Sequence, residues 1–129
     1  MRPCLARTIE HGTELRPHVD RCDWYSHAEF AEPYAQLSGN IYLSVGDTGG
    51  ELAIWNSRPE HASNPIACEC SVDRDYLGEP DLTLTPRVGE MILINSQLVH
   101  AVGKVRGLRS TLSFFLVLQT KDSPLWMYH

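Results

Sequence analysis

Two histidines and one aspartate are the residues of this chain whose types and spacing are best suited to bind a metal ion. His18 and Asp20 form a His-x-Asp motif, and His100 follows 80 residues after Asp20. Side chains at positions i and i+2 of a β-strand point to the same side, so His18 and Asp20 can face one ion. Two imidazoles and a carboxylate occupy one face of a ferrous ion and leave positions open for a bidentate acid and dioxygen. We therefore expect an iron site if the fold brings these residues together.

An arginine nine residues after His100 is placed to bind the far carboxylate of such an acid. Arg109 begins an alternating apolar segment, and its planar guanidinium can form two parallel hydrogen bonds to a carboxylate. Arg106 and, less favourably, Lys104 are the nearby alternatives. Arg106 lies beside Gly107 in a predicted turn, a position typical of a solvated surface charge. We expect Arg109 to be the cation of the site, with Arg106 as its competitor.

The size and composition predict one globular domain over residues 1–129. The net charge of −5 argues against nucleic-acid binding, which requires a basic face. No apolar run approaches the length of a transmembrane helix or of a signal peptide, so we expect neither a membrane segment nor secretion. The four cysteines lack the C-x2-4-C pairs of structural zinc sites, and we expect reduced thiols in a cytoplasmic protein.

Alternating and β-branched segments separated by glycine and proline predict a mainly β protein. About eight strands are expected, and this pattern is typical of a sandwich or jelly roll. His27 to Ala35 is the one segment that favours a short helix, and residues 57–80 predict a long surface loop with a short edge strand at 66–70. The expected strands are residues 5–11, 14–20, 40–45, 51–56, 81–85, 90–95, 98–105 and 110–120.

Two pairs of neighbouring strands have the pattern of β-hairpins. Residues 5–11 and 14–20 flank Gly12-Thr13, and residues 40–45 and 51–56 flank a glycine-rich turn. Pro17 removes a backbone donor, so its strand is expected at a sheet edge. Residues 90–95 are expected as a buried strand. The final strand, expected to be the longest, places four apolar residues on one face: Leu112, Phe114, Leu116 and Leu118.

The chain resembles the double-stranded β-helix core of the Fe(II)/2-oxoglutarate-dependent oxygenases. His18, Asp20 and His100 match the facial triad of that family, and Arg109 with Thr111 matches its Arg-x-Ser/Thr motif. The nine-residue step from histidine to arginine resembles the prolyl-hydroxylase branch, and the segments GGELAIWN and PRVGEMILINSQLVHAV resemble the strand patterns of the superfamily. A looser similarity connects the chain to the carrier-independent alkaloid halogenases. Those enzymes have glycine in place of Asp20, so Asp20 favours hydroxylation.

This resemblance implies an enzyme that uses Fe(II), 2-oxoglutarate and O2, with ascorbate in a supporting role. It would hydroxylate a small-molecule substrate, or less favourably a peptide side chain, and release succinate and CO2. The triad would hold the iron, and Arg109 with Thr111 would bind the cosubstrate. Tyr42 is a further candidate to reach the cosubstrate, with an ordinary core position as the alternative. Apart from the resemblance, Trp24, Tyr25 and Trp55 are candidates to line a substrate pocket, with ordinary core packing as the alternative for each.

Other functions stay open at this stage. Only 17 residues precede His18, whereas enzymes of this group carry supporting helices and strands ahead of the motif. The chain can therefore be a truncated relative without that N-terminal helical support, which binds metal or ligand but is catalytically idle. An exposed sheet would also favour a homodimer or another covering partner. A cupin-like metal enzyme is the remaining alternative, but cupins favour three or four histidines and leave Arg109 unexplained.

Overall fold

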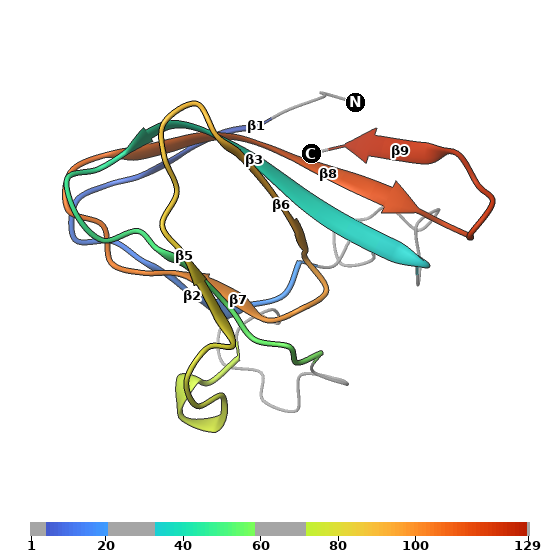
Figure 1. The fold of residues 1–129 in the computed structure, drawn as a ribbon, viewed down its shortest axis with the longest axis horizontal. Helices are drawn as coiled ribbons and strands as arrows, with labels where there is room; N and C mark the ends of the chain where they lie inside the picture. Colours follow the sequence, from blue (N-terminus) through green and yellow to red (C-terminus); the bar gives the residue numbers. More distant parts are fainter. Residues whose placement is uncertain (1–4, 21–32, 59–71, 129) are drawn as a thin grey trace.

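The chain forms two antiparallel β-sheets that face each other, the arrangement of a double-stranded β-helix (Figure 1). The computed structural model describes residues 5–20, 33–58 and 72–128. The larger sheet has the order β1-β8-β3-β6, with β9 also paired to β8, and the smaller sheet has the order β2-β7-β4-β5. The strands are β1 (Leu5–Ile9), β2 (Leu15–His18), β3 (Ala35–Val45), β4 (Leu52–Ile54), β5 (Leu82–Leu84), β6 (Met91–Asn95), β7 (His100–Val102), β8 (Arg109–Leu118) and β9 (Leu125–Tyr128).

The mainly β prediction is confirmed, and helical structure is minimal in the described residues. They contain one 3₁₀ turn, η3 (Arg74–Tyr76), whose cap Asp73 accepts a hydrogen bond from the backbone of Asp75. Within the described part of the chain, no helix is long and apolar enough to cross a membrane. The predicted helix at 27–35 falls mostly outside the described residues, and its last residue, Ala35, begins β3 instead.

Both predicted hairpins are wrong, because the chain changes sheet at each turn. β1 pairs with β8 and β2 pairs with β7, so the segments on either side of Gly12 belong to opposite sheets. In the same way β3 pairs with β6 and β8, whereas β4 pairs with β5 and β7. Alternation and turn residues indicate where strands begin and end, but they do not say which strands pair.

At two turns the chain passes from one sheet to the other. The segment between β7 and β8 holds these two turns together at one end of the molecule. Val105 accepts a hydrogen bond from the backbone of Gly12 (2.8 Å), and Arg106 accepts one from Asp47 (2.7 Å). Gly49 has a φ of +75°, and a Cβ there would collide with the carbonyl oxygen of Lys104. A side chain at this turn would therefore push two sheet connections apart.

β8 has a polar inner face, which separates the interior near it from an ordinary apolar core. Arg109, Thr111, Ser113 and Val117 are buried on the side that faces the smaller sheet. The four apolar residues predicted to share a face do so on the opposite side, where the Phe114 ring covers Gly39 of β3. The apolar stripe of β8 therefore packs on the outside of the larger sheet, and its polar residues are directed inward.

Two small hydrophobic clusters support the smaller sheet. One consists of Ile9, Leu52, Ile94, Val102 and Val105 and lies between the sheets. The other lies on the far side of the smaller sheet, beneath the segment that contains η3; its buried members are Val19, Trp55, Val99 and Ala101.

Several predicted elements differ in detail from the structure. β2 lies at a sheet edge, as Pro17 predicted. β6 is also an edge strand, and not a buried one, because Met91 is 58% exposed and Leu93 is 45% exposed. β3 begins five residues earlier than predicted and, at 11 residues, is longer than β8. β9 was not predicted. The predicted strand at 66–70 and all four cysteines lie outside the described residues.

Candidate metal centre

The two candidate metal-binding histidines are direct neighbours on adjacent strands. His18 ends β2, His100 begins β7, and the two residues are paired in the register of the smaller sheet. Their ring centroids are 4.4 Å apart. Asp20 follows two residues after His18, and its carboxylate lies 3.3 Å from His100 Nε2 and 3.7 Å from His18 Nε2. One ligand atom from each residue falls within 4.8 Å of the other two.

This spacing fits a bound first-row dication with modest adjustment. Nitrogen and oxygen ligands lie about 2.1 Å from such an ion, so ligands at right angles are roughly 3 Å apart. The observed separations of 3.3 and 3.7 Å are slightly longer. A small inward movement of the side chains would complete a three-ligand face. Two histidines with one carboxylate are the donor set that suits Fe(II).

Both imidazoles are oriented by a hydrogen bond to the backbone carbonyl of the residue two positions earlier in the chain. His18 Nδ1 lies 2.7 Å from the carbonyl oxygen of Arg16, and His100 Nδ1 lies 2.9 Å from that of Leu98. A carbonyl can only accept, so each Nδ1 must carry the proton, which assigns the neutral tautomer from the hydrogen bond. In the neutral form of each ring, Nε2 is then the lone-pair nitrogen. This arrangement fixes ring orientation and presents Nε2 to a metal.

The backbone of Asp20 is held by two hydrogen bonds, one to β3 of the larger sheet and one to the turn that follows β6. Its N–H donates to the carbonyl of Ser96 (2.9 Å), and its carbonyl accepts from the Gln36 side-chain amide (3.1 Å). Ser96 and Gln36 are fully buried and are themselves joined, because Ser96 N donates to Gln36 O (3.2 Å). Sequence reasoning missed Gln36, since a lone glutamine in an alternating strand carries no chemical signature.

The electrostatics of His18 and Asp20 favour the protonation states that bind metals. Burial lowers the pKa of His18, and the neighbouring His100 lowers it further. Burial opposes ionisation of Asp20, but the hydrogen bond and positive charge that His100 supplies when it is protonated outweigh this effect, so the pKa of Asp20 is lowered. A neutral imidazole and an ionised carboxylate are the forms that coordinate a metal ion.

Arg109 brings a buried cation to the same interior. Its side chain is 3% exposed, and its Nη2 donates to the Tyr42 hydroxyl at 3.3 Å. Burial is the main reason that the pKa of Arg109 is lowered, although a guanidinium stays protonated at neutral pH. Within the described residues its buried Nε has no hydrogen-bond acceptor. An unsatisfied buried donor on a cation is a costly arrangement that a bound carboxylate would relieve.

Two further hydroxyl groups lie beside this cation. Thr111 is buried on the same face of β8 and is paired in register with Tyr42 of β3. Burial raises the pKa of Tyr42, so its phenol keeps its proton and can donate it. The Thr111 hydroxyl lies 3.1 Å from that of Ser113, which in turn donates to Asn40 (2.7 Å). A carboxylate near Arg109 would therefore meet several donors.

The other predicted site residues lie elsewhere. Arg106 and Lys104 are exposed, and Arg106 forms an isolated bridge with Thr48. Trp55 is 2% exposed and donates from its indole nitrogen to the Gly78 carbonyl (3.1 Å), which is a packed position in the cluster outside the smaller sheet. Trp24 and Tyr25 lie outside the described residues.

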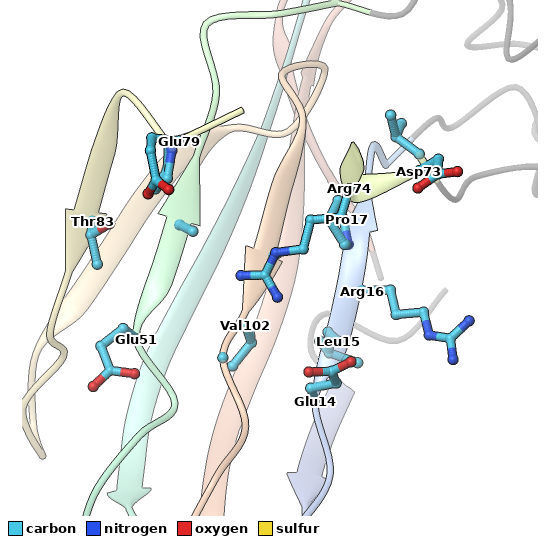
Figure 2. A pocket seen from close by; sticks show the side chains of 15 residues that line it. Glu14, Leu15, Arg16, Pro17, Glu51, Asp73, Arg74, Glu79, Thr83 and Val102 are labelled. Carbon is cyan, nitrogen blue, oxygen red and sulfur yellow. The ribbon is translucent and has the colours of Figure 1, made fainter. Parts of the chain in front are cut away.

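A separate hollow of about 750 Å³ lies on the outer face of the smaller sheet (Figure 2). Ala53 and Ala101 are paired at its floor, and each is adjacent in its strand to a residue of the inward-facing pair Ile54 and His100. The hollow is therefore on the opposite side of the sheet from the metal ligands. Figure 2 shows acidic and basic side chains together around it, namely Glu14, Arg16, Glu51, Asp73, Arg74 and Glu79.

Comparison with known proteins agrees with this site. The family model of the 2OG-Fe(II) oxygenase superfamily matches residues 4–117, so the chain belongs to that superfamily. A crystal structure of an N-substituted L-amino acid dioxygenase from Burkholderia ambifaria AMMD superposes with a TM-score of 0.72 at 21% identity, covering 98% of this chain and 53% of that one. A structure of such a dioxygenase in complex with alpha-KG, from the same organism, gives 0.69 at 20% identity, covering 98% and 52%. No curated protein sequence matches.

These likenesses establish the fold, and the superfamily supports the general reaction. At this level of identity the two solved structures show a shared architecture and carry no residue-level argument. The chain also spans about half the length of both proteins. The activity, substrate and partners of this chain are therefore matters for proposal.

Proposed function

We propose that this chain is an Fe(II)- and 2-oxoglutarate-dependent dioxygenase that hydroxylates a small molecule, with release of succinate and CO2. The observation that supports this most directly is the buried Arg109, whose Nε has no acceptor among the described residues. A structural arginine would be expected to have its donors satisfied. Binding of a dicarboxylate by Arg109 would explain both the burial of this side chain and its unpaired Nε donor.

The metal ligands have clear roles in this proposal. His18 and His100 would bind Fe(II) through Nε2, because their Nδ1 atoms are engaged with backbone carbonyls. Asp20 would supply the third ligand as a carboxylate, since its pKa is lowered despite burial. The iron, together with 2-oxoglutarate and O2, supplies the oxidising power, and ascorbate would keep the metal reduced. The protein positions and shields these reactants.

The cosubstrate would be held at its far end by Arg109, Tyr42 and Thr111. The guanidinium would pair with the carboxylate through charge-assisted hydrogen bonds, and the protonated Tyr42 phenol would donate a further one. The Thr111 hydroxyl can rotate from Ser113 toward a bound carboxylate. Of the two candidate arginines, Arg109 faces the interior and Arg106 is exposed, so we assign the clamp to Arg109.

Hydroxylation is the reaction that the ligand set supports. Asp20 occupies a coordination position that a halide would need, so the complete triad favours oxygen transfer. For the substrate we favour an N-substituted amino acid over a peptide, because the dioxygenases of the same fold are described as acting on that class. A cytoplasmic location, and assembly as a homodimer, complete the proposal. The reducing cytoplasm would preserve both Fe(II) and free thiols.

The test of this function needs no knowledge of the substrate. Purified protein with Fe(II), ascorbate and 2-oxoglutarate should form succinate slowly in air. Without oxygen, adding 2-oxoglutarate to the Fe(II) protein should produce a visible absorption band. His100→Ala should lose both signals, and the exposed control Arg106→Gln should keep both. If neither succinate nor the band appears in the wild-type protein, the proposed function is wrong.

A second candidate function is that of a catalytically idle relative that binds metal or 2-oxoglutarate through the same residues. Such a protein would show the anaerobic absorption band but no succinate at any oxygen concentration. The two measurements together therefore separate an enzyme from a binding domain.

A further inference from the structure

Arg7 on β1 places a second guanidinium on the inner face of the larger sheet. β1 runs beside β8, with Arg7 paired to Thr111 and Ile9 paired to Arg109. Ile9 is buried in the cluster between the sheets, and side chains alternate along a strand, so Arg7 shares that inward face. In Figure 1, β1 and β8 lie together across the interior from β2 and β7, which carry the two histidines.

The position of Arg7 is close enough for its charge to act on the metal centre. Burial is the largest influence on the pKa values of His18, Asp20 and Arg109, and in each case Arg7 is one of the charges that lower the pKa. Arg7 is half-buried, and among the described residues it forms no hydrogen bond or ion pair. It is thus a partly desolvated cation that faces the site without a described partner.

The charges of the assembled site leave Arg7 unmatched. Under the proposed function, the charges of Fe(II), Asp20, doubly ionised 2-oxoglutarate and Arg109 cancel. Arg7 then adds one positive charge to an interior where an unpaired charge is costly. One further anion would restore balance, and the substrate is the component of the reaction that is still to be placed.

We propose that Arg7 binds a carboxylate of the substrate and so selects small carboxylic acids over their neutral analogues. This inference rests on the proposed function and names the chemical class that its site accepts. The guanidinium fork matches a carboxylate in two parallel hydrogen bonds, which fixes the orientation of the acid as well as its position. Because β1 and β8 are hydrogen-bonded along their length, Arg7 holds this anion at a fixed distance from Arg109 and its cosubstrate. Arg7 is a specificity residue, and the chemistry stays with the metal ligands.

The experiment compares acids with their amides. The probes are N-acetyl-L-leucine, N-acetyl-L-phenylalanine and N-acetyl-L-glutamine, each paired with its uncharged carboxamide. Binding is measured by calorimetry on protein that holds Ni(II) and 2-oxoglutarate, which cannot turn over. Wild-type protein should bind at least one acid about 10- to 100-fold more tightly than its amide, as expected for a charge-assisted pair.

Variants assign this preference to Arg7. Arg7→Gln should abolish the preference for the acid, Arg7→Lys should restore part of it, and Arg106→Gln should leave it intact. Circular dichroism of Arg7→Gln and a titration of its Ni(II) form with 2-oxoglutarate show that the variant is folded and loaded.

Several outcomes would overturn the assignment. It fails if no acid is preferred over its amide, or if Arg7→Gln retains the preference. It also fails if Arg7→Gln weakens 2-oxoglutarate instead, because Arg7 would then belong to the cosubstrate clamp. A wild-type protein that neither binds 2-oxoglutarate nor forms succinate would refute the proposed function itself, which is a separate result.

Discussion

The Arg109→Gln substitution removes a buried cation while keeping a polar side chain of moderate length. In the proposed site Arg109 pairs with the far carboxylate of 2-oxoglutarate. Loss of one partner from a buried, hydrogen-bonded charge pair costs about 2–5 kcal/mol. We take about 3 kcal/mol, because Tyr42 and Thr111 would still donate to the carboxylate. This value corresponds to a dissociation constant for 2-oxoglutarate that is roughly 150-fold higher.

In the ligand-free protein, by contrast, the same substitution should leave the stability of the fold unchanged or raise it. There Arg109 has a long hydrogen bond to Tyr42 of 3.3 Å, and its Nε has no acceptor among the described residues. Replacing a poorly satisfied buried charge with a neutral group is often neutral or stabilising. We therefore expect the unfolding temperature of ligand-free Arg109→Gln to equal or exceed that of wild type.

Thermal unfolding with Ni(II) bound, with and without 2-oxoglutarate, measures both effects in one assay. At a concentration 100 times the wild-type dissociation constant, the cosubstrate should stabilise wild type by about 2.7 kcal/mol. It should stabilise Arg109→Gln by only about 0.3 kcal/mol if binding is 150-fold weaker. Arg106→Gln is the matched control and should behave as wild type.

The result that would refute this reasoning is equal stabilisation of wild type and Arg109→Gln by 2-oxoglutarate. A marked fall in the ligand-free unfolding temperature of the variant would contradict the second part, since it would show that Arg109 is already well satisfied. Retained metal binding in the variant is required in either case.

Three other predictions concern the metal ligands and their support. Asp20→Gly should end hydroxylation, measured as loss of hydroxylated product, and retained product would argue that Asp20 is not a ligand. Gln36→Leu should raise the Fe(II) concentration needed for half-saturation by about 10- to 100-fold, because it releases the Asp20 carbonyl; unchanged affinity in a metal titration would count against this support. The pKa of His18 in the folded protein is lowered from 6.5, so protons bind preferentially to the unfolded chain and ligand-free stability should fall as pH drops below that value. Asp20, whose folded pKa is also lowered, should keep its contribution until the pH falls below 3.8. Urea unfolding at pH 7.5 and 5.5 should show a smaller loss for His18→Asn than for wild type, and equal losses would exclude His18 as the cause.

Most strand positions could be predicted from the sequence, whereas the strand pairing could not. Alternation located the segments that became β5 and β8, because a half-buried strand has a period of two. Apolar, β-branched or aromatic runs beside turn residues located those that became β4 and β6. Pairing depends on which turns change sheet, and this is decided by contacts such as those of Gly12 and Asp47 with the segment before β8. Those contacts join residues far apart in sequence and leave no local pattern.

The candidate site was predictable where residue type alone indicates chemistry. His18, Asp20, His100 and Arg109 were proposed from type and spacing, and the structure brings them to one interior. Gln36 and Arg7 were not identified, since their roles follow from burial and from the pairing of β1 with β8. The apolar stripe of β8 was recognised, but the pattern could not show that its polar alternate face lines the interior.

The two anchors of Asp20 make the metal site a joint between the two sheets. The histidines belong to neighbouring strands of the smaller sheet, whereas Gln36 and Ser96, which hold the backbone of Asp20, belong to the larger sheet and to the turn that follows β6. An ion bound by all three residues would act as a cross-link, and part of its binding free energy would oppose separation of the sheets. A change in the spacing between the sheets should accordingly change the metal affinity. A core substitution such as Ile94→Ala, at a residue that is not itself a ligand, should therefore weaken metal binding.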